Sequence, residues 1–137
     1  SGPLVVISAD TAISMMAVNA KQELVGGVIL PGPQLSLSAL VKNTAQLPQI
    51  DLAAKAPASI LGKSTSSCLQ NGFVLGTASL LDGLAERFCA ELGPQTAFYA
   101  TGNLPIPIRE ACCTPILYRE TLITDGLYRI WMKNKKG

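Results

Sequence analysis

The sequence predicts a mixed α/β domain, in which helices cover a sheet of parallel and antiparallel strands. Three observations support this prediction. Three short apolar runs follow one another at the start of the chain, a long stretch of helical periodicity occupies its middle, and short apolar runs alternate with helical segments toward its end. A meander followed by strands that alternate with helices gives a mixed sheet covered by helices, and we expect helices on both faces.

The first three apolar runs are the expected meander. Pro3–Ser8 is rich in β-branched residues and Ala12–Val18 is apolar except for Ser14. After a polar turn, Glu23–Leu30 supplies the third run. Runs of this length between turn residues are typical of strands. The Pro-Gly-Pro sequence at residues 31–33 then ends the meander.

Two helices are expected next. Ser36 is a candidate N-cap for a short helix that ends near residue 47, and Gln49–Gly62 reads as a connection with one short strand. Ser66–Gly93 gives the longest helical signal, and Gly93 followed by Pro94 is a stop. The apolar residues that carry this signal recur mainly every fourth position: Leu69, Phe73, Leu80, Leu84, Phe88 and Leu92.

The last third alternates between strand and helix. Thr96–Thr101 is a predicted strand with a loop after it, Pro107–Cys113 a short helix or turn, and Pro115–Tyr118 a short strand. A closing helix is expected over Glu120–Lys133. The chain shows neither a short-period repeat nor an internal linker, so residues 1–137 are expected to form a single domain.

Composition limits the class of protein. The chain has 137 residues, of which 48% are hydrophobic and 15% charged, which favours a large core with some apolar surface left for a subunit or interdomain contact. No apolar run is long enough to span a bilayer and no signal-peptide pattern starts the chain, so we expect a cytoplasmic protein with no membrane contact.

Charge and residue types exclude several kinds of site. The net charge is +2 and the basic residues are scattered except at the tail, which does not favour nucleic-acid binding. There is no histidine, so catalysis by Ser-His-Asp or Cys-His groups is excluded. The four cysteines have no metal-ligand spacing and read as reduced core thiols.

Three loops could bind an anion. Residues 8–12 form a turn between two strands, where backbone N–H groups and the Thr11 hydroxyl could meet a phosphate oxygen. Residues 101–103 follow a strand, where open α/β sheets bind ligands. Residues 62–65 precede the long helix, whose N-terminus attracts anions. Each loop also has an ordinary structural interpretation, such as a plain hairpin turn, and each signal is weak alone.

Taken together, five ordered motifs resemble those in the second domain of type III pantothenate kinases, also called the Bvg accessory factor family. The motifs are Asp10-Thr11-Ala12, residues 26–32 (GGVILPG), residues 44–48 (TAQLP), residues 62–65 (GKST) with 70–72 (QNG), and residues 100–102 (ATG). The resemblance covers nearly the whole chain. It implies a ribonuclease-H-like domain of the actin-like ATPase superfamily, equivalent to the C-terminal half of such a kinase.

The resemblance also implies roles for single residues. Thr11 would contact the phosphates of ATP together with Asp10, and Gly102 would belong to the adenosine loop. Thr65 would reach pantothenate across a dimer. Glycines near the nucleotide would be Gly26, Gly27 and Gly32, for which close strand packing with a turn is an equally good explanation. Expected cofactors are ATP with Mg²⁺ and a monovalent cation, potassium or ammonium.

Departures from the family pattern affect the phosphate loop. Ser8 stands where the family has a cation-binding aspartate, and Asp10 where it has a glycine, so the metal position at Ser8 reads as degenerate. Asp10 would place a negative charge near phosphates. Asn103 replaces a second glycine of the adenosine loop. The first phosphate loop and the general base of the family have no counterpart among these residues, so no catalytic residue is assigned to this chain.

Two functions remain open. One is ATP-dependent phosphorylation of pantothenate, the first step of coenzyme A synthesis, with this chain supplying the ATP-binding and dimerisation half as a homodimer or together with an N-terminal half. The other is a degenerate relative that acts as a binding or regulatory protein, in line with the naming of some family members as transcription accessory factors.

Overall fold

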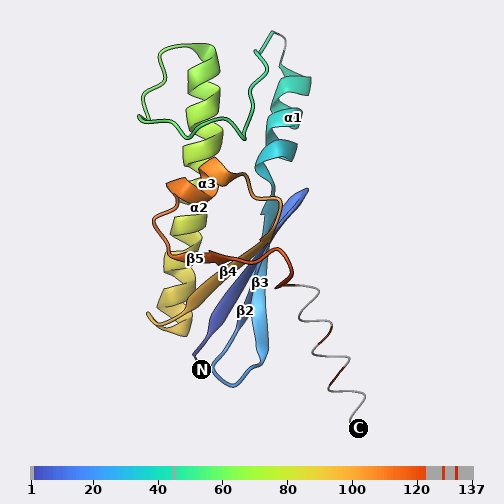
Figure 1. The fold of residues 1–137 in the computed structure, drawn as a ribbon, viewed down its shortest axis with the longest axis vertical. Helices are drawn as coiled ribbons and strands as arrows, with labels where there is room; N and C mark the ends of the chain where they lie inside the picture. Colours follow the sequence, from blue (N-terminus) through green and yellow to red (C-terminus); the bar gives the residue numbers. More distant parts are fainter. Residues whose placement is uncertain (1, 45, 123–127, 129–131, 133–137) are drawn as a thin grey trace.

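The computed structural model describes residues 2–44, 46–122, 128 and 132, and Figure 1 shows a five-stranded sheet with helices beside and beyond it. In chain order the elements are β1 (Leu4–Ala9), β2 (Ala12–Val18), β3 (Leu24–Pro31), α1 (Pro33–Asn43), α2 (Thr65–Leu92), β4 (Ala97–Gly102), α3 (Ile106–Ala111) and β5 (Ile116–Tyr118).

The sheet mixes parallel and antiparallel pairs in the order β3-β2-β1-β4-β5. The meander pairs β1 with β2 and β2 with β3 antiparallel. The two later strands run parallel to β1, since β4 pairs with β1 and β5 pairs with β4. The predicted mixed α/β class is therefore confirmed, and the carboxyl ends of β1 and β4 lie at the same edge of the sheet.

One face of the sheet forms the core. Val5 and Ile7 of β1 are fully buried, and their neighbours along the strand are only half-buried. This alternation follows from the two-residue period of a strand. Helices α1, α2 and α3 all bury side chains in this core, including Leu37, Val74 and Ile108. We expected helices on both faces of the sheet. Among the described residues, the helices pack on the face that carries Val5 and Ile7.

The long helix is confirmed, although the predicted apolar stripe is not its buried centre. The side chains of α2 that are buried are Asn71, Val74, Ala78, Leu81 and Ala85. Leu80, from the predicted stripe, is instead 42% exposed. The helix is apolar on more than one side. The residues that recur every fourth position therefore lie on a line next to the side chains that are buried, and not on the same line. Gly93 ends α2 with a φ of 117°, as the stop signal predicted.

The first helix begins earlier than predicted. Its N-cap is Gly32, and Pro33 occupies the first turn, so Ser36 lies inside α1 and is not its cap. The Pro-Gly-Pro sequence ends β3 and starts α1 at once, because the fixed φ of proline suits the first helical position and its missing N–H is not needed there. The helix ends at Asn43, before the predicted end near residue 47.

The connection between α1 and α2 has no strand among its described residues, so the short strand expected in Gln49–Gly62 is wrong. Two side chains of α2 hold this connection instead. Gln70 Nε2 donates to the backbone oxygen of Asp51 at 2.9 Å, and Asn71 Nδ2 donates to that of Ser59 at 2.9 Å. Bonds to side chains replace the ladder that a strand would have made.

Most of the closing helix expected at Glu120–Lys133 lies outside the described residues. Among the helices that the structure does describe, none combines the length and apolar character needed to cross a bilayer.

Candidate functional site

Three segments meet where β1 and β4 end. They are the turn between β1 and β2, the start of α1, and residues 102–104, which comprise the last residue of β4 and the start of the loop that follows it. Ala9 and Gly102 are partners in the register of the parallel pair, which brings the turn and the loop to the same edge. Figure 1 shows α1 rising from this edge of the sheet.

Backbone hydrogen bonds join these segments. The N–H of Gly32 donates to the oxygen of Thr11 at 2.9 Å, and the N–H of Asn103 donates to that of Ala9 at 2.6 Å. Within the turn, the N–H of Asp10 donates to the oxygen of Ala12 at 2.9 Å. The side chains of Asp10 and Thr11 remain exposed. The turn is therefore fixed by its backbone and presents its side chains to solvent.

Two of the predicted site glycines are required by this close approach. A Cβ on Gly32 would lie 2.7 Å from the backbone oxygens of Asp10 and Thr11. Gly102 has a φ of +87°, and a Cβ there would collide with the backbone oxygen of Ala9. Any larger residue would push the segments apart. The packing of the segments alone accounts for both glycines.

Gly26 and Gly27 lie away from this edge, in the first half of β3. A Cβ on Gly27 would collide with the backbone oxygen of Met15 and lie 2.6 Å from Met16 Sδ. Both glycines line a hollow of about 270 Å³ between β3 and α2. The structure does not bring them to the turn, and Gly27 serves close packing against β2.

Ser8 is half-buried on β1 and pairs in register with Ser14 of β2 and Thr101 of β4. Three hydroxyl side chains thus stand in a row on one face of the sheet, where the resemblance led us to expect a carboxylate. Among the residues that the structure describes, no group of three or more His, Cys, Asp or Glu side chains could hold a metal ion.

Thr65 is separated from the three joined segments. Thr65 is the first residue of α2. Val74, which packs in the core under the sheet, lies about 14 Å further along the helix axis at 1.5 Å per residue. Figure 1 shows α2 starting beyond the end of the sheet. A capping box closes this end of the helix, because the Ser64 side chain accepts from the Ser67 N–H at 3.1 Å and the Ser67 hydroxyl accepts from the Ser64 N–H at 2.9 Å.

Sequence reasoning missed two side chains that hold the loop after β4. Arg109 Nε donates to the backbone oxygen of Leu104 at 2.7 Å, and the Tyr118 hydroxyl donates to that of Gly102. The guanidinium of Arg109 lies 3.6 Å from the centre of the Tyr118 ring. These contacts join residues on three elements and have no periodic signal in the sequence.

Asp82 was also missed. Its carboxylate accepts from the backbone N–H groups of Cys113 at 2.8 Å and Thr114 at 2.9 Å, which ties the start of β5 to α2. Partial burial raises the pKa of Asp82, but these hydrogen bonds outweigh it and hold the pKa below its usual value. The carboxylate is therefore a structural tether.

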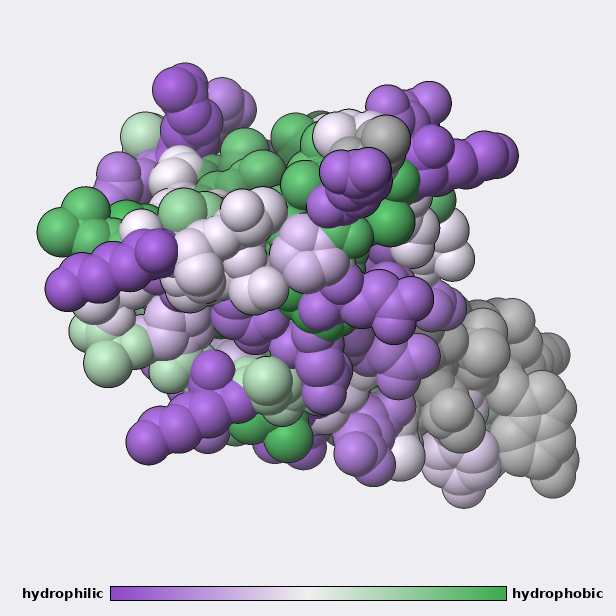
Figure 2. All heavy atoms as spheres, turned by 90° about the horizontal axis from the view of Figure 1, so that it is seen from above, coloured by the Kyte–Doolittle hydropathy of each residue, from purple (hydrophilic) through white to green (hydrophobic). Residues whose placement is uncertain are grey.

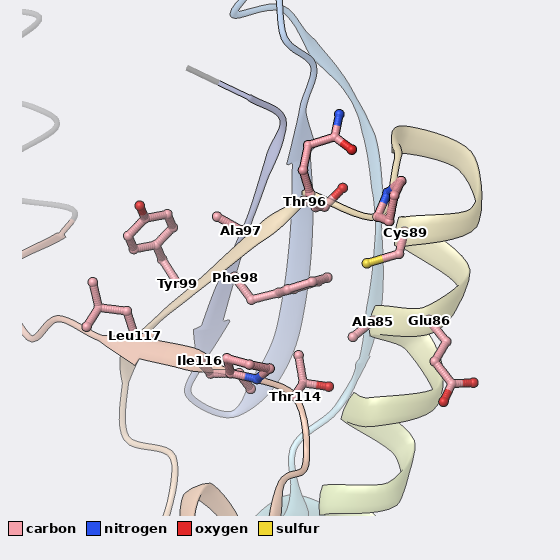
Figure 3. Close-up of a pocket in the computed structure, with 13 residues that line it drawn as sticks. Ala85, Glu86, Cys89, Thr96, Ala97, Phe98, Tyr99, Thr114, Ile116 and Leu117 are labelled. Atoms are coloured by element: carbon pink, nitrogen blue, oxygen red, sulfur yellow. The ribbon is translucent and has the colours of Figure 1, made fainter.

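A hollow of about 820 Å³ lies at the opposite end of β4, between that strand, β5 and α2. Figure 3 shows Phe98, Ala85 and Cys89 on the side of α2, while Tyr99 and Leu117 point to the other face of the sheet. The lining is mainly apolar and lies far from the Asp10 turn. It offers no cluster of groups that could carry chemistry.

Comparison with known proteins identifies the family of this chain. The family model described as type III pantothenate kinase matches residues 1–87, which is more than half of the chain. The chain belongs to the type III pantothenate kinase family. It is 38% identical over 137 residues to the type III pantothenate kinase of Koribacter versatilis (strain Ellin345), covering 99% of this chain and 49% of that protein.

A second relative agrees. The type III pantothenate kinase of Frankia alni (strain DSM 45986 / CECT 9034 / ACN14a) is 36% identical over 133 residues, which cover 97% of this chain and 52% of that protein. The chain thus spans about half the length of the type III pantothenate kinases that it matches.

A solved structure supports the fold. It is described as a conserved putative Baf family transcriptional activator from Campylobacter jejuni and superposes with a TM-score of 0.67 at 20% identity, covering 97% of this chain and 59% of that one. At this identity the likeness concerns the fold alone.

Proposed function

We propose that this chain is the C-terminal, ATP-binding and dimerisation half of a cytoplasmic enzyme that phosphorylates pantothenate to 4′-phosphopantothenate. The observation that supports this most is the meeting of the Asp10-Thr11 turn, the start of α1 and the Gly102 loop at one edge of the sheet. Ligands of open α/β sheets bind outside the carboxyl ends of strands.

The residues at this edge fit a nucleotide phosphate. The exposed Thr11 hydroxyl can donate to a phosphate oxygen, and the N-terminus of α1 adds the positive end of an 11-residue helix. Gly32 and Gly102 keep the surrounding backbone free of side chains where a Cβ would strike a neighbouring segment. Thr11 would bind the phosphates, and residues 102–104 would face the adenosine.

Bound ATP supplies the γ-phosphoryl group, which passes to a hydroxyl oxygen of pantothenate as the bond to ADP breaks. Such transfers depend on positioning and charge neutralisation. The turn and the helix end would hold the phosphates in place during this step. The base that takes the hydroxyl proton is not assigned to any residue of this chain.

The cation requirement of the enzyme would be altered here. Ser8 offers a neutral hydroxyl, so a potassium or ammonium ion bound there would lack the counter-charge that a carboxylate at this position would supply. The Asp10 carboxylate is exposed, two residues further along the chain. Asp10 near the phosphates would make Mg²⁺ more important, since the metal ion offsets repulsion between like charges. We therefore expect the activity to respond only weakly to potassium.

Assembly as a dimer, or with an N-terminal half, is proposed from the outer side of α2. Gly72 and Gly76 are exposed, and a Cβ on either would meet nothing within 4 Å. Both line a hollow of about 230 Å³ between α1 and α2. A neighbouring chain that packs here would fill this hollow.

Apolar side chains are exposed near the same end of the molecule. Figure 2 views the molecule from above, the end at which α2 begins, and shows hydrophobic surface gathered between hydrophilic groups. Ile60 and Leu61, just before α2, are 65% and 75% exposed. Cover by a neighbouring chain would also bring Thr65 close to pantothenate bound by a partner.

A non-catalytic regulatory protein is the second candidate. The observation that favours it is Ser8 at the end of β1, a neutral hydroxyl residue at the position where the resemblance implies a cation-binding carboxylate. Such a protein would keep the fold and the dimer but would not transfer phosphate.

Assays of 4′-phosphopantothenate formation separate the two candidates. The complete protein should form the product from ATP and pantothenate, and this chain alone should not. A complete protein that is folded and inactive across a range of potassium concentrations would support the regulatory function. If the chain alone formed the product, the general base that takes the proton of the pantothenate hydroxyl would have to be a residue of this chain, which would contradict the proposal.

A further inference from the structure

The loop after β4 is held by side chains from two later elements. The backbone oxygen of Gly102 accepts from the Tyr118 hydroxyl of β5, and that of Leu104 accepts from Arg109 Nε of α3 at 2.7 Å. We propose that Arg109 and Tyr118 are positioning residues that fix residues 102–104 and so set the affinity of this half for the nucleotide. This inference rests on the proposed function.

The two side chains form one unit. The Arg109 guanidinium stacks on the Tyr118 ring at 3.6 Å, and both residues are half-buried. Stacking holds the planar guanidinium in one orientation, in which Nε faces the loop. A small cavity of about 150 Å³ beside them is lined by Ala100, Leu104, Arg109, Thr114, Ile116 and Tyr118.

The loop needs this support because of its backbone conformation. Gly102 has a φ of +87°, which a flexible glycine adopts but does not keep by itself. The Asn103 N–H is bonded to the Ala9 oxygen at 2.6 Å. Residues 102, 103 and 104 are therefore each held by a different element: β5, β1 and α3.

The strand that carries Tyr118 is itself anchored at both ends. Asp82 accepts from the N–H groups of Cys113 and Thr114 before β5, and the N–H of Arg119 donates to the oxygen of Ala100 at 2.7 Å after it. A three-residue strand at the edge of a sheet would otherwise move easily. Because both ends of β5 are held by hydrogen bonds, the Tyr118 hydroxyl stays in position to donate to the backbone oxygen of Gly102.

The role is one of positioning because Arg109 and Tyr118 act through backbone oxygens of the loop. Their loss would let the loop sample other conformations, and the fraction competent for nucleotide would fall. The apparent affinity for nucleotide falls in proportion to that fraction. Turnover with saturating nucleotide would stay unchanged.

The test uses Tyr118→Phe and Arg109→Lys in the complete protein. Tyr118→Phe removes the hydroxyl but keeps the ring, and Arg109→Lys keeps the charge but loses the planar stack. Each variant should raise KM for ATP about five- to tenfold, as expected for losing one hydrogen bond. The values of kcat and of KM for pantothenate should stay within about twofold of wild type by the same reasoning.

Tyr99→Phe is the matched control. Tyr99 is a half-buried tyrosine of β4 that points to the other face of the sheet, as Figure 3 shows, so its loss of a hydroxyl should leave KM for ATP unchanged. Hydrogen exchange of the Asn103 and Leu104 amides supplies a second measurement. It should become faster in both variants and stay unchanged in the control.

The outcomes separate this inference from the proposed function. A lower melting temperature with unchanged KM for ATP and unchanged exchange would show a merely structural role and overturn the inference. If the wild-type protein uses no ATP, the proposed function fails, and the exchange rates still decide whether Arg109 and Tyr118 fix the loop: faster exchange supports this, and unchanged exchange overturns it.

Discussion

The backbone N–H of Asn103 donates to the backbone oxygen of Ala9 across 2.6 Å, and this bond couples the loop after β4 to the turn after β1. The two segments are 94 positions apart in the chain. They meet because β4 runs parallel to β1. The Asn103 side chain is exposed, so asparagine in place of the family's second glycine leaves the bond intact. A change in either segment should therefore disturb the other.

Gly102→Ala tests this coupling. The variant should lose about 1–3 kcal/mol of unfolding free energy, because φ is +87° and the new Cβ would strike the Ala9 oxygen. Urea denaturation measures the loss. Gly83→Ala is the control, since its Cβ would enter open space on a helix outside the hollow beside α1 and should stabilise the protein by up to about 1 kcal/mol. Equal stability of Gly102→Ala and wild type would show that the loop is not tightly held.

Gly76→Leu tests the proposed dimer. The structure gives the new side chain open space, so the monomer should fold. A leucine in the hollow beside α1 would overpack the contact and weaken the dimer by about 1–3 kcal/mol per site, and a twofold contact repeats the change on each partner. Sedimentation measures the association.

Gly83→Leu is the matched control for this helix. Gly83 also has open space at its Cβ but does not line the hollow beside α1. It should leave sedimentation unchanged. A Gly76→Leu protein that remains a dimer with a lowered melting temperature would remove α2 from the interface.

Asp82→Asn tests the tether between α2 and β5. The pKa of Asp82 in the folded protein is below its unfolded value, so the carboxylate stabilises the fold above about pH 4, and that stability is lost as the pH falls through the folded pKa. The variant should be about 1 kcal/mol less stable at pH 7, because a side chain with one acceptor oxygen replaces one with two. Unfolding measured from pH 7 to pH 3 should show the difference shrink. A difference that stays constant with pH would contradict this role.

The cysteines should differ in reactivity. Partial burial, with smaller effects from Asp82 and Cys113, raises the pKa of Cys112 to about 12, so its thiol stays protonated at neutral pH. Cys68 and Cys113 are exposed. Iodoacetamide at pH 8 followed by mass spectrometry should label these two and spare Cys112, which should react once the protein is unfolded. Labelling of native Cys112 at the same rate as Cys113 would contradict its burial.

The fold class followed from local patterns, which gave the type of most elements. The β-branched run at Pro3–Ser8 became β1 and the long helical signal at Ser66–Gly93 became α2, although the fourfold spacing did not show which side of α2 is buried. The start of α1 was missed because the Pro-Gly-Pro sequence at residues 31–33 both ends β3 and begins the helix, so one short segment carries two signals. The short strand expected within Gln49–Gly62 is absent, and side-chain hydrogen bonds from Gln70 and Asn71 of α2 hold that connection instead.

The candidate site was only partly visible in the sequence. The resemblance implied that Thr11, Gly32 and Gly102 lie near the nucleotide, and the structure joins their three segments through backbone hydrogen bonds. The third candidate anion loop, residues 62–65, is instead at the start of α2, away from these segments. The packing of Gly27 against Met15 and Met16 could not be predicted, because it depends on the register between β2 and β3. Arg109 and Tyr118 left no sequence signal, since their contact needs α3 and β5 to be placed first.

The most direct test of the central proposal is calorimetric titration of the complete protein with ATP and Mg²⁺, comparing wild type with Thr11→Val and with Thr44→Val as an exposed control threonine outside the site. Wild type and Thr44→Val should bind ATP with equal affinity, and Thr11→Val should bind about tenfold more weakly, the cost of one hydrogen bond to a charged phosphate. Equal affinity of all three proteins, or no binding by wild type, would contradict a phosphate site at the end of β1.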